Sequence, residues 1–91
     1  MVLSAGDCPV CSALGKVIFL TAEPQGGVFV ACNSCKGASR ATDTGRDWLR
    51  RPVEDFAPTG FRAASRHEVE ATGFDMRHVM KVDDGEFRLL L

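Results

Sequence analysis

The sequence lacks any strong charge excess, any long apolar run and any low-complexity segment. Its 91 residues carry 11 Lys or Arg against 12 Asp or Glu, and the net charge of −1 argues against non-specific coating of nucleic acid. No apolar run approaches the length of a membrane span. Residues 1–7 are too few for a signal peptide and lack its apolar core, so we expect a cytoplasmic protein without membrane contact.

A recognisable catalytic constellation is also absent from the sequence. Serine, histidine and acidic side chains occur, but without the spacing of a nucleophile and its base, and no open metal site can be named. We therefore expect that the protein is not an enzyme, and no small-molecule substrate is evident.

All four cysteines of the chain stand in two C-x-x-C pairs. Cys8 and Cys11 form the first pair, Cys32 and Cys35 form the second, and residues 12–31 separate them. Two such pairs about 15–20 residues apart are typical of a four-thiolate zinc site. Their sulfurs can surround Zn²⁺ as a tetrahedron with Zn–S distances of about 2.3 Å. Because no coordination position stays open, we expect the zinc to be structural rather than catalytic.

Four thiolates around Zn²⁺ leave a local charge of −2, which N–H donors and nearby cations must balance. Lys16, Lys36 and Arg40 lie close to the cysteines in the sequence, and we expect them to supply part of this balance. His67 and His78 are not needed as metal ligands, because the cysteines complete the site.

With this spacing, residues 7–42 resemble the zinc-ribbon family, whose four-cysteine pattern rubredoxin shares. The resemblance implies two C-x-x-C turns, or knuckles, that are joined by a β-hairpin and followed by a further strand. It also implies a small zinc-dependent β-fold that commonly binds nucleic acid or protein. Ser12 and Lys36 follow the second cysteine of each pair, where the family often has glycine, and Gly37 comes one residue later.

Iron binding, disulfides and redox chemistry are alternative uses of the same cysteines. A rubredoxin-like iron electron carrier would share the cysteine pattern, but the chain has no Tyr and no aromatic side chain crowds the knuckles. Disulfides rarely persist in the reducing compartment that we expect, and a thioredoxin-type motif needs a βαβ context that is missing. Zinc is therefore the metal that the sequence favours.

The apolar segments of the first half predict a β-hairpin. Residues 17–20 and 28–31 are short, apolar and rich in β-branched side chains, and turn residues bound each segment. Pro and Gly mark residues 23–27 as the connecting loop. The second strand leads directly into Cys32, so the hairpin would bring the two knuckles together. A third strand is expected around residues 39–42.

The best helix of the chain is expected over residues 65–73. Ser65 can cap its start, and Glu68 stands three residues later, which is the spacing of a capping box. Gly73 lies where a glycine commonly ends a helix.

Two interpretations compete for the C-terminal residues. Asp84 and Gly85 are typical of a type I′ turn and predict a β-hairpin that pairs Val82 with Phe87. A rival interpretation is a helix-turn-helix, with a recognition helix over residues 76–82 and a wing after it. In that case the chain would be a zinc-ribbon plus helix-turn-helix DNA-binding regulator.

Charge is spread unevenly along the chain. Residues 36–66 have a local charge of +3, whereas residues 67–91 have a local charge of −3. Residues 47–51 favour a short helix that Pro52 ends, and Trp48 in this segment either fills the core or stacks on bases. The residues that we expect to contact a partner are Lys36, Arg40, Arg46, Trp48, Arg50 and Arg51.

Together these features predict a small, metal-stabilised α+β protein. Residues 1–44 would form an N-terminal zinc ribbon with a β-hairpin and a third strand. Residues 45–91 would add one capped short helix and a C-terminal β-hairpin, packed on the ribbon as a single compact unit. We expect a non-enzymatic interaction or regulatory module that binds zinc and contacts a protein or a nucleic acid.

Overall fold

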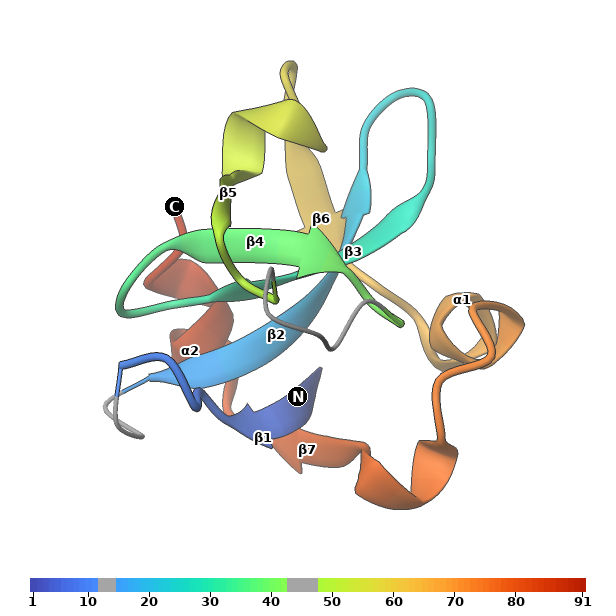
Figure 1. The fold of residues 1–91 in the computed structure, drawn as a ribbon. Helices are drawn as coiled ribbons and strands as arrows, with labels where there is room; N and C mark the ends of the chain where they lie inside the picture. Colours follow the sequence, from blue (N-terminus) through green and yellow to red (C-terminus); the bar gives the residue numbers. More distant parts are fainter. Residues whose placement is uncertain (12–14, 43–47) are drawn as a thin grey trace.

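The computed structural model of the protein describes residues 1–11, 15–42 and 48–91. Within these residues, seven strands form one antiparallel sheet in the order β5-β4-β3-β2-β1-β7, and β6 pairs with β2 (Figure 1). The strands are β1 (Val2–Asp7), β2 (Lys16–Ala22), β3 (Val28–Cys32), β4 (Gly37–Arg40), β5 (Arg51–Pro52), β6 (Phe61–Ala63) and β7 (Met80–Val82). The remaining elements are the helices α1 (Arg66–Ala71) and α2 (Asp84–Arg88) and the 3₁₀ turns η1 (Val53–Asp55) and η2 (Met76–His78). An antiparallel sheet with two short helices agrees with the predicted α+β class.

The predicted β-hairpin is present as β2 and β3. Val17 pairs with Cys32, so the hairpin continues into the second knuckle, which comprises residues 32–35. Strand β4 then pairs with β3 and supplies the third strand. It begins at Gly37 rather than at residue 39, because the chain reverses at Lys36, whose φ is +64°.

Strand β2 lies at the centre of the core, because its side chains are buried on both faces. Ile18 stands between Val17 and Phe19 in the sequence, and alternation along the strand places it on the opposite face. The two faces belong to different apolar clusters. The first cluster contains Leu3, Cys8, Val17, Phe19, Val30, Cys32, Ala41, Leu49, Ala64 and Val69, and the second contains Val2, Ile18, Leu20, Ala22, Phe29, Ala31, Ala38 and Ala57.

Strand β1 is not predicted by the sequence analysis, because its small residues show no alternation of apolar and polar side chains. In the structure it lies between β2 and β7, where Ser4 is opposite Ile18 on one side and Met80 on the other. A β-bulge lies between Ser4 and Gly6, whose φ is +98°, and Ser4 Oγ accepts a hydrogen bond from Gly6 N at 2.9 Å. A bulge bends its strand, and this strand leads directly into Cys8.

Helix α1 confirms the predicted capping box. Ser65 Oγ accepts a hydrogen bond from Glu68 N at 3.2 Å, and Glu68 Oε1 accepts one from Ser65 N at 2.9 Å. Gly73, with φ +85°, follows the C-cap residue, as predicted for the end of this helix. Val69 is buried in the first cluster and fixes α1 against the sheet.

The predicted C-terminal β-hairpin is wrong, because residues 84–88 form helix α2. The Asp83 side chain caps this helix by accepting a hydrogen bond from Gly85 N at 2.7 Å, and acidic residues fill the first turn, where the helix dipole favours them. Phe87 on this helix and Leu90, which follows its C-cap, both pack against the second cluster. Strand β7 pairs with β1 instead.

The predicted recognition helix over residues 76–82 is also wrong. Only Met76–His78 forms a short 3₁₀ turn, capped by the Asp75 side chain, and Val79 has extended backbone angles. Residues Met80–Val82 continue as strand β7, because pairing with β1 satisfies their backbone groups. The described chain therefore has no second helix at the position that a helix-turn-helix requires.

The helix predicted over residues 47–51 is not formed in its described part. Leu49 has φ +60°, and Arg51 belongs to β5, because the residue before a proline is driven to an extended conformation. Residue 47 and the predicted boundary between residues 44 and 45 lie outside the described residues. Among the helices that the structure describes, none has the length and apolar character needed to cross a membrane.

Candidate metal centre

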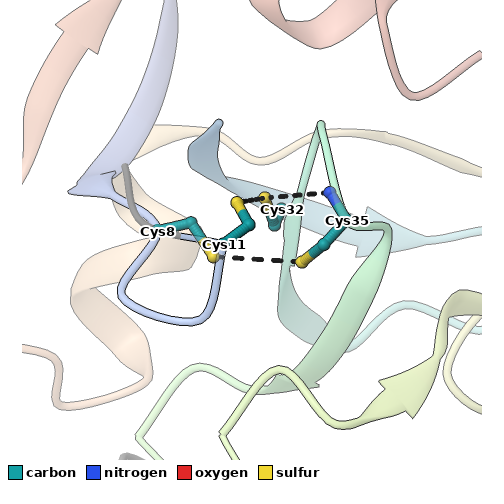
Figure 2. A group of neighbouring side chains, drawn as sticks. All are labelled: Cys8, Cys11, Cys32 and Cys35. Carbon is teal, nitrogen blue, oxygen red and sulfur yellow. Dashed lines mark hydrogen bonds between the residues drawn. The ribbon is translucent and has the colours of Figure 1, made fainter. Parts of the chain in front are cut away.

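The two knuckles meet at one end of the β2–β3 hairpin. The first knuckle, residues 8–11, follows the bulged end of β1, and Cys8 N donates a hydrogen bond to Gly15 O at 2.9 Å, just before β2 begins. The second knuckle starts at Cys32, the last residue of β3, and Lys36 N closes its turn by donating to Cys32 O at 3.1 Å. The hairpin thus holds both turns side by side (Figure 2).

The four cysteine sulfurs form a cluster with the dimensions of a metal site. Cys8 Sγ lies 3.9 Å from Cys35 Sγ, and Cys11 Sγ lies 3.5 Å from Cys32 Sγ. All four sulfurs lie within 4.8 Å of one another, and none is in a disulfide. Four sulfurs at about 2.3 Å from a common tetrahedral centre would be about 3.8 Å apart, so the cluster could hold a metal ion.

The site is closed on one side and open on the other. Cys8 and Cys32 are fully buried and belong to the first cluster, whereas Cys11 is half-buried and Cys35 is exposed. The inner half of the sulfur cluster is therefore part of the hydrophobic core, so displacement of these sulfurs would disturb the packing of the core.

The buried thiols and the half-buried Cys11 thiol have pKa values shifted in opposite directions. Burial raises the pKa of Cys32 to about 12 and also raises that of Cys8. At Cys11 burial acts in the same direction, but hydrogen bonds with the Cys32 and Cys8 thiols outweigh it and lower the pKa to about 7. A metal ion that binds here must displace protons, which couples its affinity to pH.

Backbone N–H groups donate hydrogen bonds that would offset part of the negative charge of thiolates at this site. Ser34 N and Cys35 N donate to Cys32 Sγ at 3.3 and 3.4 Å. Lys36, which directly follows the second knuckle, adopts the left-handed conformation with φ +64°, which favours glycine over residues with a Cβ atom. Ser12, the corresponding residue of the first knuckle, lies outside the described residues.

Gly15 is a site residue whose importance only the structure reveals. A Cβ atom at this position would lie 2.6 Å from Cys32 Sγ and 2.6 Å from the Ser34 Cβ. Because both are well inside van der Waals contact, the knuckles can approach each other only if residue 15 has no side chain. Its place directly before an apolar strand is the one sequence signal that could have pointed to it.

The structure places the three cations predicted near the site at different distances from it. Lys16 begins β2 beside the first knuckle, and its ammonium forms an ion pair with Asp7. Lys36 directly follows the second knuckle, and its Nζ donates to Asn33 O at 2.9 Å. Arg40 ends β4, about 10 Å further along the strand from Gly37, so it does not contribute to the knuckles.

The predicted partner-contact residues do not form one continuous face. Arg40 ends β4 and Arg50 directly precedes β5, so the antiparallel pairing places these two exposed residues at the same end of the strand pair. Lys36 lies at the opposite end. Arg51 is engaged within the protein, with Asp55 at 3.0 Å and its guanidinium over the Phe56 ring. Arg46 lies outside the described residues.

Trp48 packs against the first cluster, and its indole Nε1 is buried without a hydrogen-bond partner among the described residues. This placement favours the interpretation of Trp48 as a core residue over that of a base-stacking residue. Two further arginines of the +3 segment are also neutralised locally, since Arg62 pairs with Glu68 at 2.7 Å and Arg66 with Glu70 at 3.1 Å. Three of the six basic residues that the structure describes in this segment are thus paired with acidic side chains on the folded surface.

The sulfur geometry is consistent with a zinc-ribbon-like motif, which the cysteine spacing first indicated. Comparisons with protein families, with curated proteins and with solved structures find no match for this chain.

Proposed function

We propose that the protein is a non-enzymatic binding module that a structural zinc ion stabilises. The observation that carries this proposal is the set of four cysteine sulfurs, which all lie within 4.8 Å of one another at one end of the β2–β3 hairpin. Four-sulfur tetrahedral sites suit zinc or iron. Zinc is favoured because two C-x-x-C pairs at this spacing are typical of a four-thiolate zinc site. A site with four protein ligands leaves no position for a substrate, which supports a non-enzymatic role.

Metal analysis of the purified protein tests this part of the proposal. We expect one zinc per chain and a colourless protein, and we expect Co²⁺ to replace zinc with the absorption of a tetrahedral thiolate complex. A Cys11→Ser variant, which removes one half-buried ligand, should bind either metal far more weakly. Iron with visible colour would instead indicate an electron carrier, and a protein that binds neither metal would contradict the proposal.

We further propose that the partner is a protein surface that carries acidic groups, contacted through Arg40 and Arg50. Both side chains are exposed at one end of the β4–β5 pair, and neither forms an ion pair among the described residues. Because Arg51, Arg62 and Arg66 pair with acidic side chains, the described part of the +3 segment presents few unpaired basic side chains on its surface. Such a surface supports selective contact with a few carboxylates better than binding along a phosphate backbone.

A binding assay with three labelled probes distinguishes the partner classes: a polyglutamate peptide, duplex DNA and single-stranded RNA. We expect the zinc-loaded protein to bind polyglutamate weakly and the Arg40→Ala/Arg50→Ala variant to lose that binding. Lys81→Ala, which removes an exposed cation on β7, is the matched control and should behave like wild type. Tight DNA binding whose log–log salt slope changes by about 0.9 per removed arginine would point to nucleic acid instead.

A further inference from the structure

We infer that helix α2 is a supporting part of the metal centre, so that docking of α2 and binding of the metal strengthen each other. This inference rests on the proposed metal-binding function and adds to it a part of the chain that contains no cysteine. The connection runs through Asn33 and Lys36, the first inside the second knuckle and the second directly after it.

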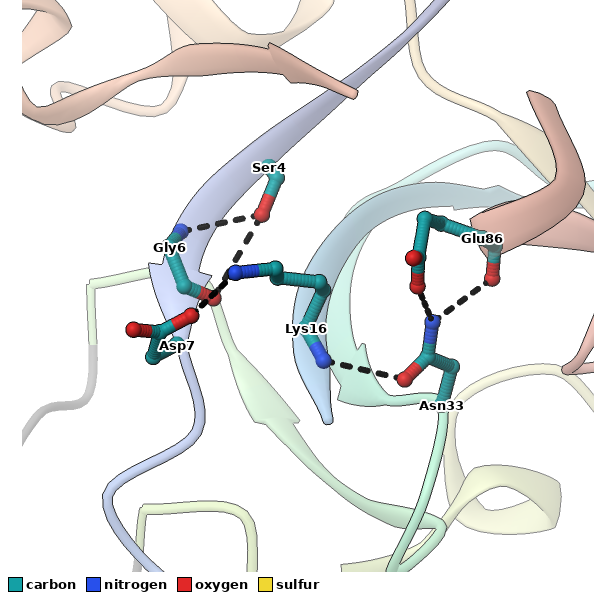
Figure 3. A network of polar contacts seen from close by, with 6 residues as sticks. All are labelled: Ser4, Gly6, Asp7, Lys16, Asn33 and Glu86. Atoms are coloured by element: carbon teal, nitrogen blue, oxygen red, sulfur yellow. Dashed lines mark hydrogen bonds and ion pairs between the residues drawn. The ribbon is translucent and has the colours of Figure 1, made fainter. Parts of the chain in front are cut away.

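The Asn33 side chain links the second knuckle to α2 and to the start of β2. Its amide Nδ2 donates to Glu86 O at 2.8 Å and to Glu86 Oε2 at 2.7 Å, and its Oδ1 accepts from Lys16 N at 2.9 Å (Figure 3). Asn33 is only 4% exposed. With both amide protons and the oxygen engaged, the orientation of the residue between Cys32 and Cys35 depends on where α2 lies.

Lys36 connects the other end of α2 to the same knuckle. Its Nζ donates to the backbone oxygen of Asn33 and to that of Leu89, the C-cap residue of α2. A cation at the carbonyl end of a helix satisfies acceptors that have no partner within the helix. The only other polar contact of α2 with a distant element in the described chain is the ion pair between the N-terminal amine of Met1 and Asp84 at 2.9 Å.

Helix α2 depends on tertiary contacts, because it has only five residues and isolated helices of that length are not stable in water. Its apolar contacts are Phe87, which meets the Phe61 ring edge-on at 6.1 Å, and Leu90, which packs on the second cluster. If the second knuckle loses its geometry, α2 loses its contacts with Asn33 and Lys36 together. By reciprocity, loss of α2 must weaken metal binding by the same factor.

Release of α2 would also change the surface of the protein. A hollow of about 300 Å³ lies beside the second knuckle and is lined by Lys36, Pro52, Val53, Glu54, Phe61 and Leu90. Leu90 forms one wall of this hollow, and Phe87 covers part of Phe61. Metal loss would therefore uncover an apolar surface that the metal-bound protein keeps closed.

The experiment uses the full chain and compares zinc dissociation constants by competition with a chromophoric chelator. Phe87→Ala undocks α2 at a residue that packs on the second cluster, whereas the buried cysteines belong to the first. Phe56→Ala removes the same kind of side chain from the second cluster outside α2, where it stacks on Phe29 at 5.5 Å. We expect Phe87→Ala to weaken zinc binding at least fivefold and Phe56→Ala less than twofold. Asn33→Asp keeps the oxygen that accepts from Lys16 N but places a carboxylate against the Glu86 carboxylate. This variant should also weaken zinc binding at least fivefold.

Hydrogen exchange supplies a second readout on the wild-type protein. Partial removal of zinc should accelerate exchange of the amides of residues 84–91 before those of α1. Equal zinc affinity of the Phe87→Ala and Phe56→Ala variants, or amides of residues 84–91 that stay protected without zinc, would overturn the inference while leaving the zinc site intact. A wild-type protein that binds no zinc would overturn the proposed function as well. Should Phe87→Ala fail to fold, an unchanged zinc affinity of Asn33→Asp is sufficient to reject the coupling.

Discussion

Gly15 lies against the second knuckle, and the space that a side chain would need is taken by Cys32 and Ser34. The restriction is steric and concerns the second knuckle alone. Close packing of this kind means that even one methyl group forces the surroundings to move.

Gly15→Ala should therefore weaken zinc binding about tenfold or more, because relieving an overpacked contact costs about 1–3 kcal/mol and here separates the sulfurs. Zinc competition with a chelator measures the effect. Gly27→Ala, in the hairpin loop, is the control. Its φ of +101° makes alanine unfavourable for stability, but the added Cβ would meet nothing within 4 Å, so zinc affinity should not change. Equal zinc affinity of Gly15→Ala and wild type would refute the steric explanation.

Lys36 combines an unfavourable backbone conformation with useful side-chain contacts. Its φ of +64° is unfavourable for any residue with a Cβ atom, whereas its ammonium group reaches Asn33 O and Leu89 O. Lys36→Gly and Lys36→Ala both lose these contacts, but only glycine adopts the left-handed backbone conformation without the steric cost of a Cβ atom. We expect Lys36→Gly to be more stable than Lys36→Ala by about 1 kcal/mol.

Urea unfolding of the two zinc-loaded Lys36 variants measures this difference, with m-values compared to exclude a change in the unfolded state. If the alanine variant is as stable as the glycine variant, the left-handed conformation of residue 36 carries no cost. The glycine that zinc ribbons often have at this position would then need another explanation.

At the scale of elements, Glu68 joins α1 to strand β6. Its carboxylate accepts two hydrogen bonds from Arg62, at 2.8 and 2.7 Å, while it also completes the capping box with Ser65 N. The Arg62 guanidinium, followed by the Ser65 N–H, lowers the pKa of Glu68 to about 2 from an ordinary value of 4.5. The folded state thus favours the ionised carboxylate, and the stability that this supplies is present above pH 4.5 and lost as the pH falls toward 2.

Glu68→Gln should remove the ion pair but keep the capping box, because glutamine can accept the same hydrogen bond. We expect it to be about 1 kcal/mol less stable than wild type at pH 7, a modest value because Arg62 is half exposed and water screens the pair. The difference should shrink as the pH falls from 5 toward 2. Comparing the two proteins at each pH cancels the loss of metal in acid.

Thermal or urea unfolding at several pH values measures the Glu68 effect, and Glu68→Ala, which also breaks the capping box, should be less stable than Glu68→Gln at every pH. A difference between wild type and Glu68→Gln that stays constant down to pH 2 would mean that Arg62 does not hold the ionised form.

For the whole molecule, metal removal should unfold much more than the knuckles. Cys8 and Cys32 are buried in the first cluster, and β1 and β2 pair with β7 and β6, so the N-terminal and C-terminal parts share one sheet. Structural zinc contributes about 10–16 kcal/mol in zinc-finger peptides, which equals or exceeds the stability of a typical small domain. We expect a chelator, or Cys32→Ser, to unfold residues 7–42 and to release the strands paired with them.

Two-dimensional NMR of the zinc-loaded and zinc-free protein checks this expectation, and return of the dispersed spectrum on adding zinc is the control for reversibility. A zinc-free spectrum that is unchanged and well dispersed would show that the apolar clusters alone maintain the fold. The fold would then be independent of the metal, even if the metal binds.

The sequence by itself determined the features that depend on residues close together in the chain. The two C-x-x-C pairs indicate the candidate metal ligands because each pair lies within a turn of four residues. The β-branched apolar segments indicate the β2–β3 hairpin, and the spacing of Ser65 and Glu68 indicates the start of α1. Each of these signals is local, so no distant partner is needed to interpret it.

Only the tertiary structure decided what the ends of the chain do. Asp84 and Gly85 suit both a hairpin turn and the first turn of a helix. In the folded protein these residues form α2, and the Asn33 side chain, 53 residues away in the sequence, donates hydrogen bonds to Glu86 of this helix. Partners that are distant in the sequence compete for the same backbone and side-chain groups, and that competition is settled only by folding.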